Sequence, residues 1–211
     1  MNRFERYCKS LSEIRRIGEK IPRVYFKDNH RAVDIELLLE RHYDIQIDTV
    51  PLSFDHGIEA YLSISGSKIY IDTGLADSDS QENRYRFTLA EELAHKIIHE
   101  PIYADVKDAE DWIKIWKEIP DETFRRLDKN AKELAGIILM PEKEFWKRAI
   151  EIKCSLYGLY VINGKPSDEQ KSQMMVEVRK ILMDDFQVNE EPCRIRLGRI
   201  EKWEQKSLFD C

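Results

Sequence analysis

The segment RFTLAEELAHKIIH, residues 86–99, decides the fold of this chain. Its apolar residues recur at intervals of three and four, which predicts a largely buried helix. Glu91, His95 and His99 follow one another at four-residue steps, so a helix places their side chains along one face. Glu92 lies beside that row. We expect the row to converge at a point where a cation can bind.

The same spacing is typical of the metallopeptidase motif H-E-x-x-H, in which two histidines bind a metal ion and the glutamate acts as general base. In this chain Glu91 stands in place of the first histidine. Carboxylate and imidazole both bind zinc, but they give the ion a different charge and basicity. The motif alone leaves an alternative open, an ordinary amphipathic helix whose Glu and His residues face water or pair with neighbours.

A second frame uses His95 and His99 as the metal-binding pair. The residue after His95 is then Lys96, which cannot act as a general base, so a metal in this frame would be structural or inhibitory. The alternative for His99 is a hydrogen bond to a terminal carbonyl of the helix, where its ring also favours the negative end of the helix dipole. We favour this alternative for His99.

The composition predicts a folded protein without a general affinity for nucleic acid. The chain has 211 residues, 34 basic and 40 acidic, and a formal net charge of -6, which argues against a protein-wide positive surface for DNA or RNA. Residues 1–7 contain no apolar signal region, and no stretch is long enough to span a bilayer. We therefore expect a cytoplasmic protein without membrane contact. The four cysteines form no C-x-x-C pair, so no thiolate zinc site is predicted.

Periodicity predicts the other helices and strands. The helical patterns cover residues 3–20, 32–41, 120–140 and 168–186, and a short helix or lid is expected within residues 105–120. Alternating patterns predict three strands at residues 45–50, 58–64 and 68–72. The last two strands are joined by a connection of hairpin length, so they should pair antiparallel. The fold class is therefore α+β, rich in helices, with a small antiparallel sheet of about three strands.

Asp128 lies near the start of the helix that is expected at residues 120–140. Counting by threes and fours from Asp128 leads to Ala131, Ala135 and Ile138. Its carboxylate is therefore expected on or beside the buried face of that helix.

Three ordered motifs resemble those of one known family. Residues 86–99 match the pattern R-F-T-L-A-H-E-L-G-H-x-x-x-H except at Glu91 and Ala94. Residues 128–141 resemble an acidic ligand followed by A-N-x-F-A-A-x-L-L-M-P. The third motif, F-x-V-S followed by R-L, is resembled by residues 186–189 and 196–197. On these motifs the chain is similar to the ImmA/IrrE metallopeptidase family.

The resemblance implies a zincin-like fold, with a helix-rich body, a small antiparallel sheet and a metal ion held between two helices. We expect an N-terminal helix within residues 1–30, a zincin-like core over residues 31–150, and a C-terminal helical region over residues 151–211 packed on the core. Better-known members of the family are cytoplasmic proteases that cut helix-turn-helix repressors. They thereby regulate genes of mobile elements or stress responses.

Carried over position by position, the resemblance implies that Glu91, His95 and Asp128 bind the metal and that Glu92 is the catalytic general base. The expected cofactor is a divalent ion, and zinc is expected before others. A ligand set with two carboxylates shifts the preference toward manganese or iron. The expected activity is a metal-dependent peptidase acting on a helix-turn-helix repressor-like protein. Two of the three ligand positions depart from the family pattern. An alternative therefore stays open, an inactive member that binds no metal and acts as a protein-binding regulatory module.

Overall fold

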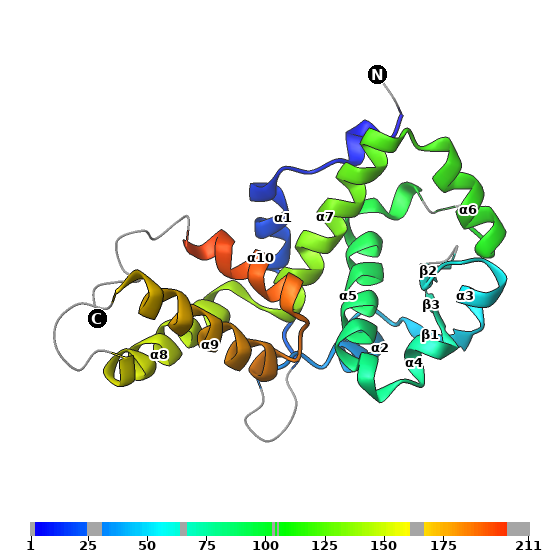
Figure 1. Cartoon of the computed structure of the whole chain (residues 1–211). Helices are drawn as coiled ribbons and strands as arrows, with labels where there is room; N and C mark the ends of the chain where they lie inside the picture. The colour runs from blue at the N-terminus through cyan, green and yellow to red at the C-terminus, as the bar shows by residue number, and fades with distance from the viewer. Residues whose placement is uncertain are drawn as a thin grey trace. The chain divides into compact units, whose positions relative to one another are not determined.

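Figure 1 shows the computed structural model, which describes residues 3–24, 31–63, 67–102, 104, 106–160 and 167–201. The chain forms two compact units. The first unit comprises residues 1–24 and 33–139, and the second comprises residues 25–32 and 140–211. The predicted region boundaries at residues 30 and 150 stay predictions.

The first unit contains most of the secondary structure. In chain order its elements are η1 (Glu5–Tyr7), α1 (Leu11–Gly18), α2 (Ile35–His42), β1 (Gln46–Val50), α3 (Leu52–Asp55), β2 (Ala60–Leu62), β3 (Lys68–Asp72), α4 (Thr73–Ala76), η2 (Asp79–Gln81), α5 (Glu82–His99), η3 (Glu100–Ile102), α6 (Ala109–Glu118) and α7 (Asp121–Leu139). The α+β fold class is thus confirmed, as is the short helix that was expected within residues 105–120.

The sheet has the strand order β1-β3-β2 and is mixed (Figure 1). Strands β2 and β3 pair antiparallel as predicted, with Tyr61 opposite Tyr70. Strand β1 runs parallel to β3, with Ile47 opposite Ile69, so the expectation of a wholly antiparallel sheet needs this correction. The reason is topological, because β3 enters between β1 and β2. Alternation of apolar residues reports the faces of a strand and not the order of its neighbours.

Helices α5 and α7 pack side by side and form the centre of the first unit (Figure 1). Both helices carry buried leucine and alanine residues: Leu89, Ala90, Leu93 and Ala94 on α5, and Leu127, Ala131, Leu134 and Ala135 on α7. Small side chains on both helices allow close approach of the two backbones. This contact places the polar residues at the edges of the two helices next to each other.

The N-terminal residues do not form the single helix that was predicted over residues 3–20. Residues after η1 are extended, and α1 begins only after Ser10, whose hydroxyl and the Glu13 side chain form a reciprocal capping box. The extended part is held by Asn130 of α7. The Asn130 side-chain oxygen accepts a hydrogen bond from the backbone N–H of Lys9 at 2.6 Å, and its amide donates to the Lys9 carbonyl at 3.0 Å.

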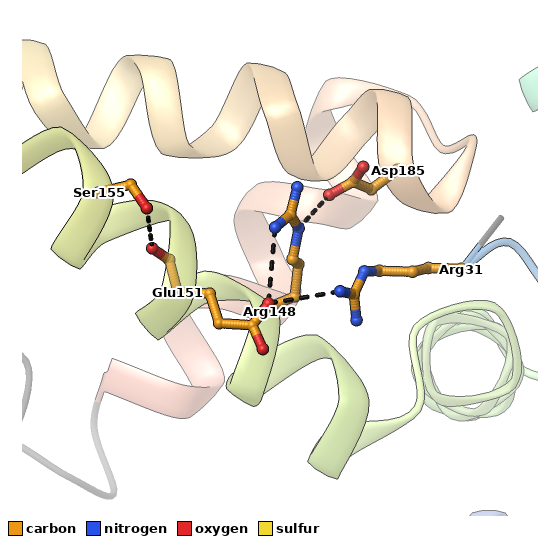
Figure 2. Close-up of polar contacts among 5 residues, drawn as sticks. All are labelled: Arg31, Arg148, Glu151, Ser155 and Asp185. Atoms are coloured by element: carbon orange, nitrogen blue, oxygen red, sulfur yellow. Dashed lines mark hydrogen bonds and ion pairs between the residues drawn. The ribbon is translucent and has the colours of Figure 1, made fainter. Parts of the chain in front are cut away.

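The second unit contains α8 (Glu142–Tyr160), α9 (Asp168–Phe186) and α10 (Glu190–Glu201). Arg148 of α8 bonds Asp185 of α9 through Nε at 2.6 Å and lies 3.5 Å from Glu151 (Figure 2). Arg31 bonds the same Glu151 oxygen at 3.3 Å, and the Ser155 hydroxyl donates to the Glu151 carbonyl at 2.9 Å. Two guanidinium groups thus neutralise two carboxylates between helices.

Arg196 in the third motif is a structural residue of the second unit. Its side chain is buried, and its Nε donates to the carbonyl of Met140 at 3.0 Å while Nη2 lies 3.4 Å from Glu142. Phe186 and Val188 of the same motif are also fully buried. Separately, no helix within the described ranges is long and apolar enough to cross a bilayer.

Candidate metal and active site

Helix α5 presents the residues that were predicted from its four-residue spacing. Glu92, His95 and His99 are buried, and Arg86 in the first half of the helix is buried too. The Arg86 guanidinium donates to the carbonyl of Val33 at 2.9 Å, which ties α5 to the segment before α2. Arg86 of the first motif therefore has a structural role, in which it orients helix α5.

Glu91 faces Asp128 across the contact between α5 and α7. Burial raises the pKa of Glu91 to about 7; the ammonium of Lys132 opposes this effect, and a hydrogen bond with Asp128 adds to it. The structure thus brings together two of the three predicted ligand positions.

Asp128 is also bound by Lys132, one turn further along α7. The Lys132 Nζ lies 2.9 Å from one carboxylate oxygen of Asp128 and 3.0 Å from the other. This is the i, i+4 geometry in which opposite charges on a helix meet. Asp128 thus has one hydrogen-bonding neighbour from each of the two helices.

His95, the third predicted ligand, bonds His99. The two Nδ1 atoms are 3.1 Å apart. Burial lowers the pKa of His95 to about 4 and lowers the pKa of His99 as well, where the neighbouring His95 adds to the effect. Both rings are therefore neutral at pH 7, and one Nδ1 donates its proton to the other. The prediction that His99 bonds a terminal carbonyl is wrong for Nδ1.

The second ring nitrogen of His99 has a different environment. The side chain of His99 is fully buried, and its Nε2 finds no hydrogen-bond partner within the part of the chain that the structure describes. Histidine pairs at hydrogen-bond distance can orient each other and fix their tautomers.

Glu92, the predicted general base, points toward the sheet. Its side chain is buried, and the backbone N–H of Leu62 on β2 bonds its carboxyl group. Burial, with Glu91 as the next cause, raises the pKa of Glu92 to about 8. Sequence reasoning predicted the position of Glu92 beside the row of Glu91 and His95, but not its contact with the strand.

The arrangement of donors does not fit a catalytic zinc site as it stands. Zinc in such sites takes three protein ligands that converge within about 2.0–2.3 Å of one point. Among the described residues, no group of three His, Cys, Asp or Glu side chains is placed to hold an ion. Asp128 bonds Lys132 and Glu91. The three predicted ligands are neighbours without forming a ligand set.

Sequence reasoning did not single out Lys132, which pairs with Asp128. Nothing in the apolar periodicity of residues 120–140 marks it, since an exposed lysine one turn after an aspartate is ordinary on a helix surface. A signal was nevertheless present in the second motif. Aligned on its L-L-M-P end, the motif has asparagine where this chain has Lys132.

Comparison with known proteins identifies the family. The IrrE N-terminal-like domain of peptidase family M78 matches residues 74–191, more than half of the chain. The chain belongs to the ImmA/IrrE family. The match spans α5, α7 and the whole candidate site, and it confirms the resemblance that was drawn from the three motifs. M78 is a family of zinc metallopeptidases, which makes the departure of this chain at its ligand positions informative.

A solved structure with a related fold is a Mycobacterium tuberculosis transcriptional regulator, at a TM-score of 0.50 and 13% sequence identity. The match covers 92% of this chain and 48% of the regulator, so the chain spans about half the length of that protein. At this identity the likeness concerns the fold alone. No curated protein matches the sequence significantly.

Proposed function

We propose that this chain is a regulatory member of the ImmA/IrrE family that binds a helix-turn-helix repressor-like protein in the cytoplasm without cleaving it. The observation that carries the proposal is the pairing of Asp128 with Lys132 and Glu91, which uses one predicted metal ligand for internal contacts. Peptide hydrolysis by this family's chemistry needs an open cation with three protein ligands. The contacts of the predicted metal ligands therefore support a chain that keeps the family fold without the peptidase reaction.

Two further observations support a regulatory role. The fold is similar to that of a transcriptional regulator, which agrees with such a role. The net charge of -6 opposes direct DNA binding by the whole chain. A protein that binds a repressor can change transcription without touching DNA.

The second candidate is the metal-dependent peptidase. It is favoured by the closeness of Glu91, His95 and Asp128, whose charges act on one another. In this proposal these three residues hold a divalent ion and Glu92 serves as general base. Two carboxylates and one imidazole are a harder ligand set than two histidines and a glutamate, so manganese or iron would compete with zinc.

Substitution of Glu92 by glutamine separates the two candidates. Glu92→Gln keeps the size of the side chain and removes its ability to accept a proton, an effect that costs a general-base enzyme about 10²- to 10⁴-fold in rate. Wild type and Glu92→Gln are incubated with zinc, manganese or iron and with repressors encoded beside the gene. Products are followed by mass spectrometry, and binding is measured by calorimetry.

We expect both proteins to bind the same repressor with equal affinity and to leave it intact. Cleavage by wild type that is absent in Glu92→Gln would overturn the proposal in favour of the peptidase. Binding of no repressor by either protein would overturn the proposed partner class.

A further inference from the structure

The ammonium group of Lys132 lies beside Asp128 at the candidate site, where a bound metal ion would supply positive charge. We infer that Lys132 takes the electrostatic place of the metal ion and keeps divalent cations out of the site. The inference rests on the proposed function and assigns to one residue the loss of metal binding.

The geometry of the pair carries the inference. Lys132 Nζ is within hydrogen-bond distance of both oxygens of Asp128, at 2.9 and 3.0 Å. An ammonium that bonds both oxygens leaves neither of them facing an ion without competition. The side chain of Asp128 is 27% exposed and that of Lys132 is 52% exposed, whereas Glu92 and His95 are buried.

The charge of Lys132 acts on the other two predicted ligands as well. Glu91 and His95 both lie within reach of its electrostatic interaction. One positive charge therefore acts on all three positions at which a divalent ion would act. Like charges disfavour each other at short range, and partial burial strengthens the effect.

Glu91 lies beside the same carboxylate, so the ammonium of Lys132 is placed against two acidic side chains. A divalent ion bound by these carboxylates would have to displace the ammonium.

Removal of the ammonium should therefore restore metal affinity. The test compares full-length wild type with Lys132→Gln and Lys132→Ser, two neutral variants that keep a polar side chain. The matched control is Lys129→Gln, which removes the same charge from an exposed position of the same helix. Zinc and manganese are the probes, titrated by competition with a chromophoric chelator, and the fold is checked by circular dichroism.

We expect both Lys132 variants to bind zinc or manganese at least about tenfold more tightly than wild type, and Lys129→Gln to bind like wild type. Equal affinity of the folded Lys132 variants and Lys129→Gln would overturn the inference and leave the proposed function standing. Tight binding by wild type would also overturn it. Repressor cleavage by wild type, measured separately, would overturn the proposed function itself.

Discussion

Two polar clusters of this protein, one in each unit, differ in their balance of charge. In the second unit, Arg31 and Arg148 face Glu151 and Asp185, so two positive groups meet two negative groups (Figure 2). In the first unit, the carboxyl groups of Glu91 and Asp128 lie beside one ammonium group, that of Lys132.

The electrostatic consequences of the two clusters are opposite. Hydrogen bonding to Asp185 raises the pKa of Arg148, which marks a contact that stabilises the charged form. Burial raises the pKa of Glu91 and Glu92, which marks carboxyl groups whose charged form is disfavoured. Perturbed carboxyl groups are typical of functional sites, whereas balanced ion pairs are typical of structural ones. The first cluster therefore has the electrostatic character of a functional site, and the second is a structural contact between side chains of the second unit.

The largest expected effect is on the balanced cluster. Arg148→Ala should lower the free energy of unfolding by about 2 kcal/mol, because it leaves the partly buried Asp185 without its charged donor. Arg31→Ala is the matched control, since its pair with Glu151 is more exposed and should contribute less than about 1 kcal/mol. Urea denaturation measures both. Equal losses in the two variants would show that the Arg148 contact has no special role.

The second expected effect concerns the cluster of Glu91, Asp128 and Lys132. Glu91→His should raise zinc affinity about tenfold, because imidazole restores a nitrogen ligand that zinc favours and removes one buried carboxyl group. Glu91→Gln serves as control, since it removes the charge without supplying a ring nitrogen. A zinc titration in which Glu91→His gains nothing over Glu91→Gln would indicate that the helix geometry no longer suits a metal.

The smallest expected effect concerns Asp72, a carboxylate that is satisfied by a backbone donor instead of a cation. The Ser53 N–H donates to it at 2.7 Å. Burial opposes ionisation of Asp72, but hydrogen bonds from Ser53, Leu75 and Gly74 together outweigh it and lower its pKa. Its contribution to stability is therefore fully present above the ordinary aspartate pKa and is lost as the pH falls through the lowered folded-state value.

Asp72→Asn should consequently cost about 1 kcal/mol at pH 6, a magnitude typical of a carboxylate that accepts a backbone N–H, and less at pH 3. Thermal unfolding at both pH values measures the difference. Asp48→Asn, at an exposed pair with Lys68, is the control that should change little. A loss for Asp72→Asn that grows toward acid would contradict the assigned sign.

Much of the fold could be predicted because local patterns agree with tertiary structure. The helix expected at residues 168–186 is found as α9, where a capping box at Ser167 marks its start. Helix α8 was not predicted, since buried Lys153 interrupts the apolar pattern that would have indicated it. The single helix expected over residues 3–20 is not found, because Ser10 caps a helix that begins only at Leu11.

The candidate site was predictable only in part. The four-residue spacing correctly brought His95 and His99 together, since that contact lies within one helix. The contacts of Asp128 depend on how α5 packs on α7 and on the rotamer of Lys132, and no local pattern encodes either. A ligand position can therefore be matched in sequence while its side chain serves another partner.

The most direct test of the central claim is the metal content of the wild-type protein. The protein is purified without chelator and analysed by inductively coupled plasma mass spectrometry beside His95→Ala, which removes a predicted ligand. We predict that wild type and His95→Ala contain equal, substoichiometric amounts of zinc, manganese and iron. One equivalent of any of these metals in wild type that is lost in His95→Ala would contradict the claim that Lys132 has replaced the ion.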